Sequence, residues 1–309
     1  EEEEEEEEEE DAAPKNHDVA EYARQVLGRA DIIVVGGGNT LYAIDRWEDL
    51  DVDKFLEDAM NRGAVLTGGS AGAICWFDGG HSDSCDPNSF YTSMMKKFGT
   101  DASGNVDDDN GGGGNDLPAP DESAIDDDDD DAPANKDWKY IRIPCLGFIP
   151  GLCCPHHDRV QSNGVLRADD FDEMLLRNYN NTQNSSNELG IAIDHWAALV
   201  CRGEDDSYQV ISLDGKKGSV LYSEDSGDGD ETDATSASSA ATFSRDADGV
   251  PGIWLKEVQD GKAVRQLLPE SGKLSQILRR PTSSSSSSIV TDGIDKDAVE
   301  ECRRLNRPS

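Results

Sequence analysis

The sequence predicts an α/β fold, in which a mostly parallel sheet is flanked by helices, from three observations. Short apolar runs alternate with segments whose apolar residues recur at helical spacing. One run, residues 64–66, leads into the turn Gly-Gly-Ser-Ala-Gly at 68–72, which connects a strand to a helix. Another run, residues 30–35, leads into a triple-glycine turn at 36–38. Apart from Asp31, both runs are apolar, so we expect two buried parallel strands.

The elements follow one another in the order that an open α/β sheet requires. Before residue 80 the sequence predicts a helix over 19–27, a strand over 30–35, helices from 41 and over 52–60, a strand over 64–66 and a helix over 71–77, then a polar turn at 81–84. After residue 137 it predicts strands over 138–143 and 146–149, a helix over 171–176, a strand pair over 189–193 and 197–201, a strand over 208–213 and a hairpin within 253–268.

Acidic residues are concentrated in three stretches of low complexity. The chain of 309 residues has 65 acidic and 28 basic residues, and residues 1–11, 101–137 and 223–248 hold 33 of the acids but only Lys136 and Arg245 as bases. The rest of the chain has an ordinary charge balance for a soluble domain. Because acidic runs repel themselves and bury little apolar area, we expect these stretches to be disordered.

This distribution defines the expected domain organisation. We expect one α/β domain, since the chain has enough residues for a sizeable core and shows no internal repeat. The boundaries are a disordered acidic arm at 1–16, the α/β domain at 17–222 with a disordered insertion at 99–137, a second disordered insertion at 223–248, a β extension of the domain at 249–280 and a disordered tail at 281–309.

Composition also limits the classes of partner. The net charge of −37 argues against a nucleic-acid backbone as ligand. The seven cysteines form no C-x-x-C pair, so we expect reduced thiols, no metal site and a cytoplasmic protein. No stretch of about 18 apolar residues is present, so we expect no membrane span. A homodimer stays open as an assembly.

Ser70 is the candidate nucleophile. Gly68, Gly69 and Gly72 surround it where a strand must turn abruptly into a helix, and such a turn can hold a serine hydroxyl exposed on a strained backbone. The backbone N–H groups of the following helix would face an oxyanion formed at this serine. The alternative is a turn that needs small residues for its backbone alone.

The triple-glycine turn at 36–38 has two interpretations. It does not match the dinucleotide-binding fingerprint, because Leu41 stands where the third glycine is required, so no nucleotide cofactor is expected. Glycines here allow a close backbone approach to a ligand at the carboxyl ends of the strands. A purely structural tight turn is the alternative.

A serine nucleophile needs a base within hydrogen-bond reach and a group that orients this base. Of the five histidines, His156, His157 and His195 are the stronger candidates. Pro155 restricts the backbone just before His156, directly after an expected strand. This is where a base on a rigid loop would lie.

Four segments together resemble the peptidase E and cyanophycinase family of serine peptidases. They are Val-Gly-Gly-Gly-Asn-Thr at 35–40, Gly-Gly-Ser-Ala-Gly-Ala at 68–73, Cys-Pro-His-His-Asp at 154–158 and Gly-Ile-Ala-Ile-Asp at 190–194. The resemblance implies a fold similar to class I glutamine amidotransferases. It also implies that Ser70 is the nucleophile, that His156 is the general base and that His157 lines the site as a wall.

The resemblance implies further roles. It favours Asp194 as the acid that orients His156, with Asp83 as the alternative or as a residue of the cleft rim. The oxyanion donors would be the N–H groups of Ala71 and of a glycine in the 36–38 turn, Gly37 or Gly38. Substrate would be contacted by Asn39, Asp83, Arg159 and Arg167, where an arginine could hold an aspartyl carboxylate; a solvated surface arginine is the alternative at 159 and 167.

The resemblance also implies the reaction. Family members hydrolyse bonds that follow aspartate, in α-aspartyl dipeptides or in the β-aspartyl-arginine links of cyanophycin. The arginine-rich pattern of the cyanophycin-degrading branch is not evident here, which favours small aspartyl peptides as substrate and an α-aspartyl dipeptidase-like activity. The rival interpretations are a catalytically inactive binding module of the same fold and an interaction protein that acts through its acidic arms.

Overall fold

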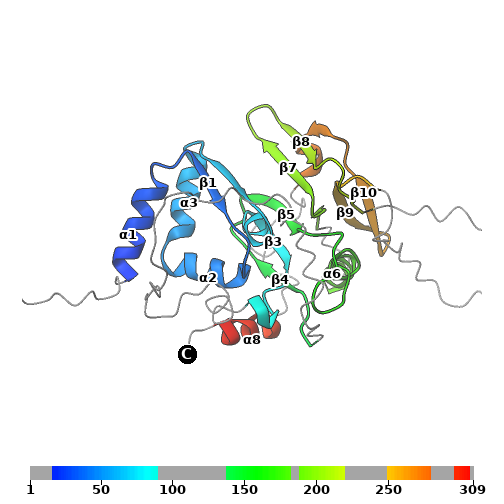
Figure 1. Cartoon of the computed structure of the whole chain (residues 1–309), viewed down its shortest axis with the longest axis horizontal. Helices are drawn as coiled ribbons and strands as arrows, with labels where there is room; N and C mark the ends of the chain where they lie inside the picture. The colour runs from blue at the N-terminus through cyan, green and yellow to red at the C-terminus, as the bar shows by residue number, and fades with distance from the viewer. Residues whose placement is uncertain (1–15, 90–136, 182–187, 220–248, 280–295, 307–309) are drawn as a thin grey trace, which may run out of the picture. The chain divides into compact units, whose positions relative to one another are not determined.

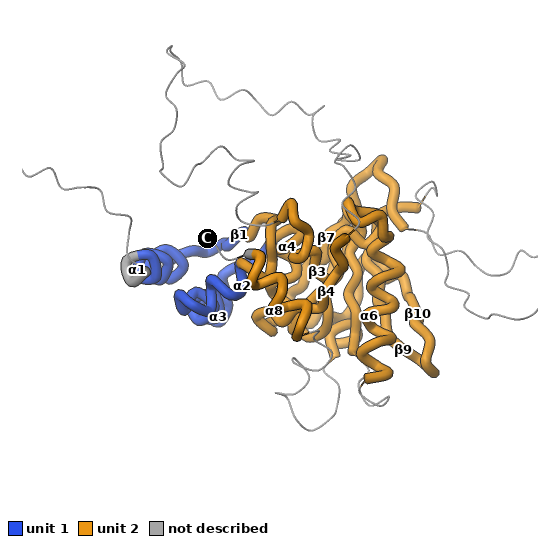
Figure 2. Tube along the Cα trace, turned by 90° about the horizontal axis from the view of Figure 1, so that it is seen from below, with its two compact units in different colours: residues 1–34, 43–67 blue, residues 35–42, 68–309 orange. Residues whose placement is uncertain are grey.

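The computed structural model describes residues 16–89, 137–181, 188–219, 249–279 and 296–306. Most of the predicted disordered regions, residues 1–15, 99–136, 223–248 and 281–295, lie outside these described residues. The chain divides into two compact units, shown in Figure 2, of which the first comprises residues 1–34 and 43–67 and the second comprises residues 35–42 and 68–309. None of the helices in the described ranges is long and apolar enough to cross a membrane.

The first part of the chain contains the expected alternation of helices and strands (Figure 1). Its elements are α1 (Asn16–Leu27), β1 (Ile32–Val35), α2 (Thr40–Asp49), α3 (Val52–Asn61) and β2 (Val65–Gly68). Helices α1 and α3 contact each other, and β1 and β2 form a two-stranded sheet.

The expectation that both strands are buried was wrong. Ile33 is buried, whereas its neighbours Ile32 and Val34 are 63% and 72% exposed, and Val65 in β2 is 57% exposed. Successive side chains of a strand point to opposite faces, so this pair of strands buries one face and leaves the other open. A run of apolar residues in the sequence therefore does not establish that both faces of a strand are buried.

The second unit is built on a six-stranded sheet with the order β10-β9-β6-β5-β3-β4. The strands are β3 (Phe77–Ser82), β4 (Ile141–Pro144), β5 (Ile149–Cys154), β6 (Gly190–Ile193), β9 (Ile253–Gln259) and β10 (Lys262–Leu267). Strand β5 runs parallel to both β3 and β6, and the other pairings are antiparallel. The sheet is thus mixed, and its parallel part is the central triplet β3-β5-β6 rather than most of the sheet as expected.

Strand β3 corrects a sequence-based expectation. Residues 77–82, Phe-Asp-Gly-Gly-His-Ser, were expected to end a helix and begin a polar turn, but all six are buried in the sheet. The preceding helix α4 (Ala71–Ile74) is therefore only one turn long. A Cβ atom at Gly80 would collide with the side chain of Ile74 and lie 2.9 Å from the carbonyl oxygen of Cys153. The glycines in this strand thus permit close packing of α4 and β5, which hydrophobic periodicity does not reveal.

A three-stranded antiparallel sheet, β11-β8-β7, and helix α6 complete the second unit. Strand β7 pairs with β8 and not with β6, so the expected strand pair around residues 194–196 does not form. Helix α6 packs its apolar side, including Phe171 and Leu175, with Leu152 and Trp254 of the larger sheet (Figure 1). The bounds are β7 (Ala197–Arg202), β8 (Ser207–Ser212), β11 (Ser271–Lys273), α6 (Arg167–Asn181) and the short helix α7 (Leu274–Ile277).

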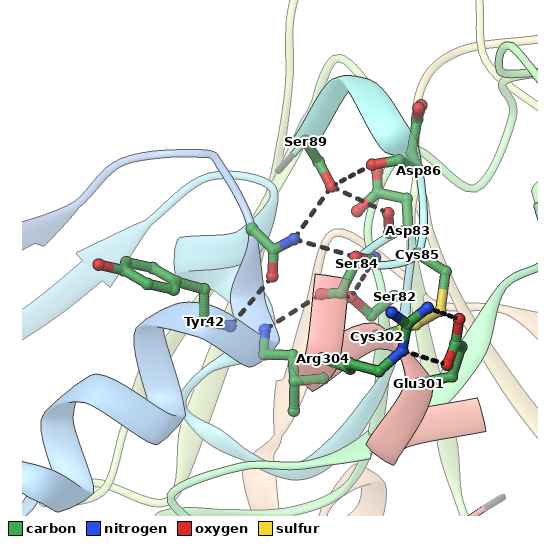
Figure 3. The surroundings of a disulfide bond; sticks show 12 residues. Tyr42, Ser82, Asp83, Ser84, Cys85, Asp86, Ser89, Glu301, Cys302 and Arg304 are labelled. Atoms are coloured by element: carbon green, nitrogen blue, oxygen red, sulfur yellow. Dashed lines mark hydrogen bonds and ion pairs between the residues drawn. A yellow bond between two sulfur atoms is a disulfide. The ribbon is translucent and has the colours of Figure 1, made fainter. Parts of the chain in front are cut away.

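A disulfide joins two segments that are distant in sequence. Cys85, before the 3-10 turn η1 (Pro87–Ser89), is bonded to Cys302 in helix α8 (Lys296–Asn306), with 5.3 Å between their Cα atoms (Figure 3). The expectation of seven reduced thiols was therefore wrong for these two, whereas Cys75, Cys145, Cys153, Cys154 and Cys201 form no disulfide bond in the described part of the chain. Helix α8 also lies in the region expected to be a disordered tail, so that expectation was wrong over residues 296–306.

Candidate active site

The central triplet of parallel strands brings the expected site residues to one edge of the sheet. Strands β3, β5 and β6 end at residues 82, 154 and 193. Asp83, His156 and His195 follow these three ends, each within two residues. The carboxyl ends of adjacent parallel strands are the usual position of a ligand site in an α/β fold. All candidate site residues belong to the second unit.

Ser70 has the strained backbone expected of a nucleophile on a sharp turn. Its φ and ψ are 55° and −120°, a conformation that residues other than glycine rarely adopt. A Cβ atom at Gly68 would lie 2.5 Å from the carbonyl oxygens of both Val35 and Gly72, so only glycine fits there. The turn at 68–72 therefore holds a serine in a costly geometry, as the sequence predicted.

Helix α4, which begins directly after Ser70, packs against β3 and β5. Ile74, at the end of α4, contacts Gly80, which pairs with Cys153 near the carboxyl end of β5. The chain then enters β3 at Phe77, which pairs with the first residue of β5. The structure records no hydrogen bond between Ser70 and His156, and in ligand-free sites such bonds are often long.

Gly37 lies directly beside Ser70. A Cβ atom at Gly37 would be 3.3 Å from the Cβ of Ser70 and 3.8 Å from its hydroxyl oxygen. Among the hydrogen bonds of the described residues, none uses the N–H groups of Gly37, Gly38 or Ala71. The three predicted oxyanion donors are thus available, and Gly37 is the glycine of the turn that the structure brings to the nucleophile.

Asn39 has a structural role in this arrangement. Its Oδ1 atom accepts a hydrogen bond from the Tyr42 N–H at 3.0 Å and so caps α2. Its Nδ2 atom donates to the carbonyl oxygen of Ser84 and to the hydroxyl of Ser89, each at 3.0 Å. Figure 3 draws these hydrogen bonds, with Ser84 next to Cys85 of the disulfide and Tyr42 farther from it. The expected substrate-binding role of Asn39 competes with these contacts, because both ends of its amide are engaged.

Arg167 is fully buried, so the alternative of a solvated surface arginine was wrong at this position. It lies 3.4 Å from the carboxylate of Asp83, donates to the carbonyl oxygen of His81 at 2.8 Å and stands over the ring of Tyr140. The guanidinium thus fastens the start of α6 to the end of β3. Asp83 and Arg167 form one buried ion pair at the carboxyl ends of the strands.

His156 combines backbone strain with a neutral ring. Its φ is 50°, and its Nδ1 atom lies 2.7 Å from the Nδ1 atom of His195. Burial lowers the pKa of His156 to about 3, the charges of Arg167 and His195 act in the same direction, and the charge of Asp83 opposes them. The ring is therefore unprotonated at neutral pH, as a general base must be.

Asp194 does not contact His156, contrary to the favoured expectation. The carboxylate is buried, and its own hydrogen-bond partner among the histidines is His157. Its Oδ1 atom accepts from His157 Nδ1 at 3.1 Å and Ser219 Oγ at 2.7 Å, and its Oδ2 atom accepts from Ser219 N at 3.1 Å, Gly252 N at 2.9 Å and Trp254 Nε1 at 3.2 Å. Burial would raise the pKa of Asp194, but the hydrogen bonds from His157 and Ser219 outweigh it and leave the pKa lowered.

Asp158 is a residue of the site to which sequence reasoning gave no role. Asp158 accepts a hydrogen bond from the backbone N–H of His195 at 2.7 Å and so ties the loop after β5 to the loop after β6. Burial, followed by the charge of Asp194, raises the pKa of Asp158 to about 6. His195 was a candidate without an assigned partner. Arg159, half-buried, lies 4.0 Å from Asp158 and close enough to lower the pKa of His156.

Comparisons with known proteins place the strained serine in a family context. Residues 11–99, which include the turns at 36–38 and 68–72, match peptidase family S51. The chain is 39% identical over 74 residues to the uncharacterized peptidase YgaJ of Bacillus subtilis (strain 168), which covers 24% of this chain and 30% of that protein. It is also 24% identical over 220 residues to the G2/mitotic-specific cyclin-1 of Trypanosoma brucei brucei, covering 71% of this chain and 48% of that protein. The chain thus spans less than half the length of these two curated relatives.

Proposed function

Because residues 11–99 match peptidase family S51, we propose that this chain is a serine peptidase that hydrolyses small aspartyl peptides. The observation that carries the proposal is the strained backbone of Ser70, with Gly37 against its side chain. A serine has no structural need for φ 55° at a turn where glycine would fit, so the conformation points to the hydroxyl as the selected feature.

The proposed mechanism is acyl transfer through Ser70. The Nε2 atom of His156 takes the hydroxyl proton while the serine oxygen bonds to the scissile carbonyl carbon. The N–H groups of Gly37, or Gly38, and Ala71 stabilise the oxyanion. His156 then gives the proton to the leaving amine as the C–N bond breaks, which leaves an acyl group on Ser70. A water molecule gives a proton to His156 and attacks the acyl carbon. The bond to Ser70 then breaks as His156 returns the proton to the serine oxygen, which releases the acid product.

Specificity for an aspartyl residue requires a cation at the mouth of the site. Arg167 is paired with Asp83 and fully buried, so it supports the floor of the site. Arg159 is half-buried beside Asp158 and acts on His156 through its charge. We therefore assign the substrate carboxylate to Arg159, with Asp83 and Arg167 holding the carboxyl end of β3 behind it.

The test is hydrolysis of an α-aspartyl dipeptide, its β-aspartyl isomer and a glutamyl control by the full chain and by Ser70→Ala. Turnover of one aspartyl isomer, lost in Ser70→Ala, is the expected result and identifies the linkage. Ser275→Ala is the matched control, since Ser275 is exposed, is hydrogen-bonded to Asp206 and is distant in sequence from Ser70. A folded protein that cleaves none of the three and does not react with a fluorophosphonate at Ser70 would favour the inactive binding module.

A further inference from the structure

The group that contacts Nδ1 of the candidate base is a second histidine. The Nδ1 atoms of His156 and His195 are 2.7 Å apart, and their ring centroids are 4.8 Å apart at an interplanar angle of 38°. This is a hydrogen-bond distance between two nitrogen atoms. In a serine peptidase, the base donates the hydrogen bond that orients its ring from the Nδ1–H group.

Proton placement in this pair follows from the chemistry of imidazole. A neutral imidazole carries one proton, so a short Nδ1···Nδ1 contact requires one ring to donate and the other to accept. For His156 to take a proton from Ser70, its Nε2 atom must be unprotonated, so its own proton lies on Nδ1. His156 then donates, and the Nδ1 atom of His195 accepts. His195 is thereby the tautomer with its proton on Nε2.

The nearby carboxylates are committed to other partners. Asp194 accepts five hydrogen bonds, all from residues other than His156. Asp83 pairs with Arg167. Asp158 holds the backbone N–H of His195. Within the described part of the chain, no carboxylate therefore accepts a hydrogen bond from His156.

We propose that His195 is the positioning residue of this site, which accepts the Nδ1 hydrogen bond of His156 and so completes a Ser70–His156–His195 arrangement. The inference rests on the proposed function, whose general base is His156. It replaces the two acids that the sequence offered for this role, Asp194 and Asp83. The acid of a serine peptidase fixes both the tautomer and the direction of its histidine, and a neutral imidazole acceptor can do the same.

Contacts on three sides hold the ring of His195 in place. Asp158 anchors its backbone N–H at 2.7 Å. The ring of Trp196 packs edge-on at a centroid distance of 4.5 Å and an angle of 86°, and the Lys216 ammonium group lies over that indole. His156 closes the third side. This pre-organisation suits a residue whose purpose is to aim another side chain.

A neutral acceptor has a distinct consequence for pH dependence. A carboxylate at this position would stabilise the imidazolium of His156 and raise its pKa, whereas His195 supplies the hydrogen bond without the negative charge. The charged and titratable groups around the pair come from the loops after β3, β5 and β6, from α6 and from the segment that follows β8: Asp83, Asp158, Arg159, Asp194, Arg167 and Lys216. These groups are common to the variants below, so differences between the variants report on position 195 alone.

The experiment compares three substitutions at His195 in the full chain. His195→Leu removes the acceptor and is expected to lower kcat about 100-fold. His195→Asn places an amide oxygen where the Nδ1 atom was and is expected to keep kcat within about 10-fold of the original. His195→Asp supplies a charged acceptor and is expected to retain turnover while the acid limb of kcat/KM moves to higher pH. Thermal unfolding of each variant excludes a loss of fold as the cause.

A purely structural His195 would give a different pattern. Equal losses in His195→Leu and His195→Asn, or an unchanged acid limb in His195→Asp, would overturn the proposal. A protein with no turnover on any of the aspartyl peptides would count against the proposed function instead. In that case, ¹H–¹⁵N NMR of the imidazoles tests the inference directly, because the proposal predicts a protonated Nδ1 atom in His156 and an unprotonated Nδ1 atom in His195.

Discussion

Two adjacent histidines of this protein occupy opposite kinds of environment. His157 is fully buried and hydrogen-bonded to Asp194, which has the appearance of a catalytic pair. His156 has φ 50° and is hydrogen-bonded to another histidine at the edge of the sheet. The Asp–His pair is enclosed by Ser219, Gly252 and Trp254. The histidine that is paired with a carboxylate, His157, therefore has a structural role here. The candidate base is the adjacent residue, His156.

The largest expected effect is a separation of activity from stability at these two positions. His156→Gln should lower kcat at least about 1,000-fold, because it removes the general base. The loss of stability should be small, since His156 lies in a loop with a strained backbone. His157→Gln should lower the free energy of unfolding by about 3 kcal/mol, because it replaces a fully buried ring and its hydrogen bond to the Asp194 carboxylate. Urea unfolding and kcat measured on both variants check this, and equal loss of activity at similar stability would contradict it.

Asp194→Asn should affect stability and leave the pH profile unchanged. The amide that replaces one oxygen would face N–H donors from Ser219, Gly252 or Trp254, so the free energy of unfolding should fall by about 3 kcal/mol. The acid limb of kcat/KM should not move, since Asp194 does not contact His156. A shift of that limb with unchanged stability would restore Asp194 as the acid of the site.

Acidification should destabilise the protein through both histidines. Burial lowers the pKa of His157 to about 4 and that of His156 to about 3, against an ordinary value of 6.5. The unfolded chain therefore binds more protons below pH 6.5, so stability falls as the pH drops from about 6.5 towards 4, by about 3 kcal/mol per histidine at pH 4. Urea unfolding across this range checks it, and His157→Gln should have the shallower slope. Equal slopes would contradict the assignment.

The smallest expected effect concerns the glycine turn at 36–38, in which Gly37 lies beside Ser70. Gly37→Ala adds a methyl group 3.3 Å from the Cβ atom of Ser70, so the turn must move by a few tenths of an ångström. We expect kcat to fall about 10-fold with an unchanged pH profile, since the oxyanion donors shift and the histidines do not. Gly36→Ala is the matched control, because a Cβ atom there has nothing within 4 Å. Equal kcat in both variants would remove Gly37 from the oxyanion site.

Residues whose role depends on local geometry could be predicted from the sequence. The turn at 68–72 needs glycine beside a strained serine, and the glycine turn at 36–38 follows directly from a strand. Both features are encoded within a few residues. Strand β3 was missed, because Asp78 and His81 are polar and are accommodated in the sheet through hydrogen bonds with Gly151 and Asp170, which are distant in sequence.

The sequence by itself determined the nucleophile turn, the position of a histidine after Pro155 and the concentration of acids in three stretches of low complexity. Only the tertiary structure decided which acid meets which histidine. Asp194 is held beside His157 by hydrogen-bond donors of residues 219, 252 and 254, which lie 25 to 60 positions away in the sequence. Hydrogen-bond partners at that separation leave no periodicity in the sequence, because they depend on strand order and on which face of the sheet each side chain takes.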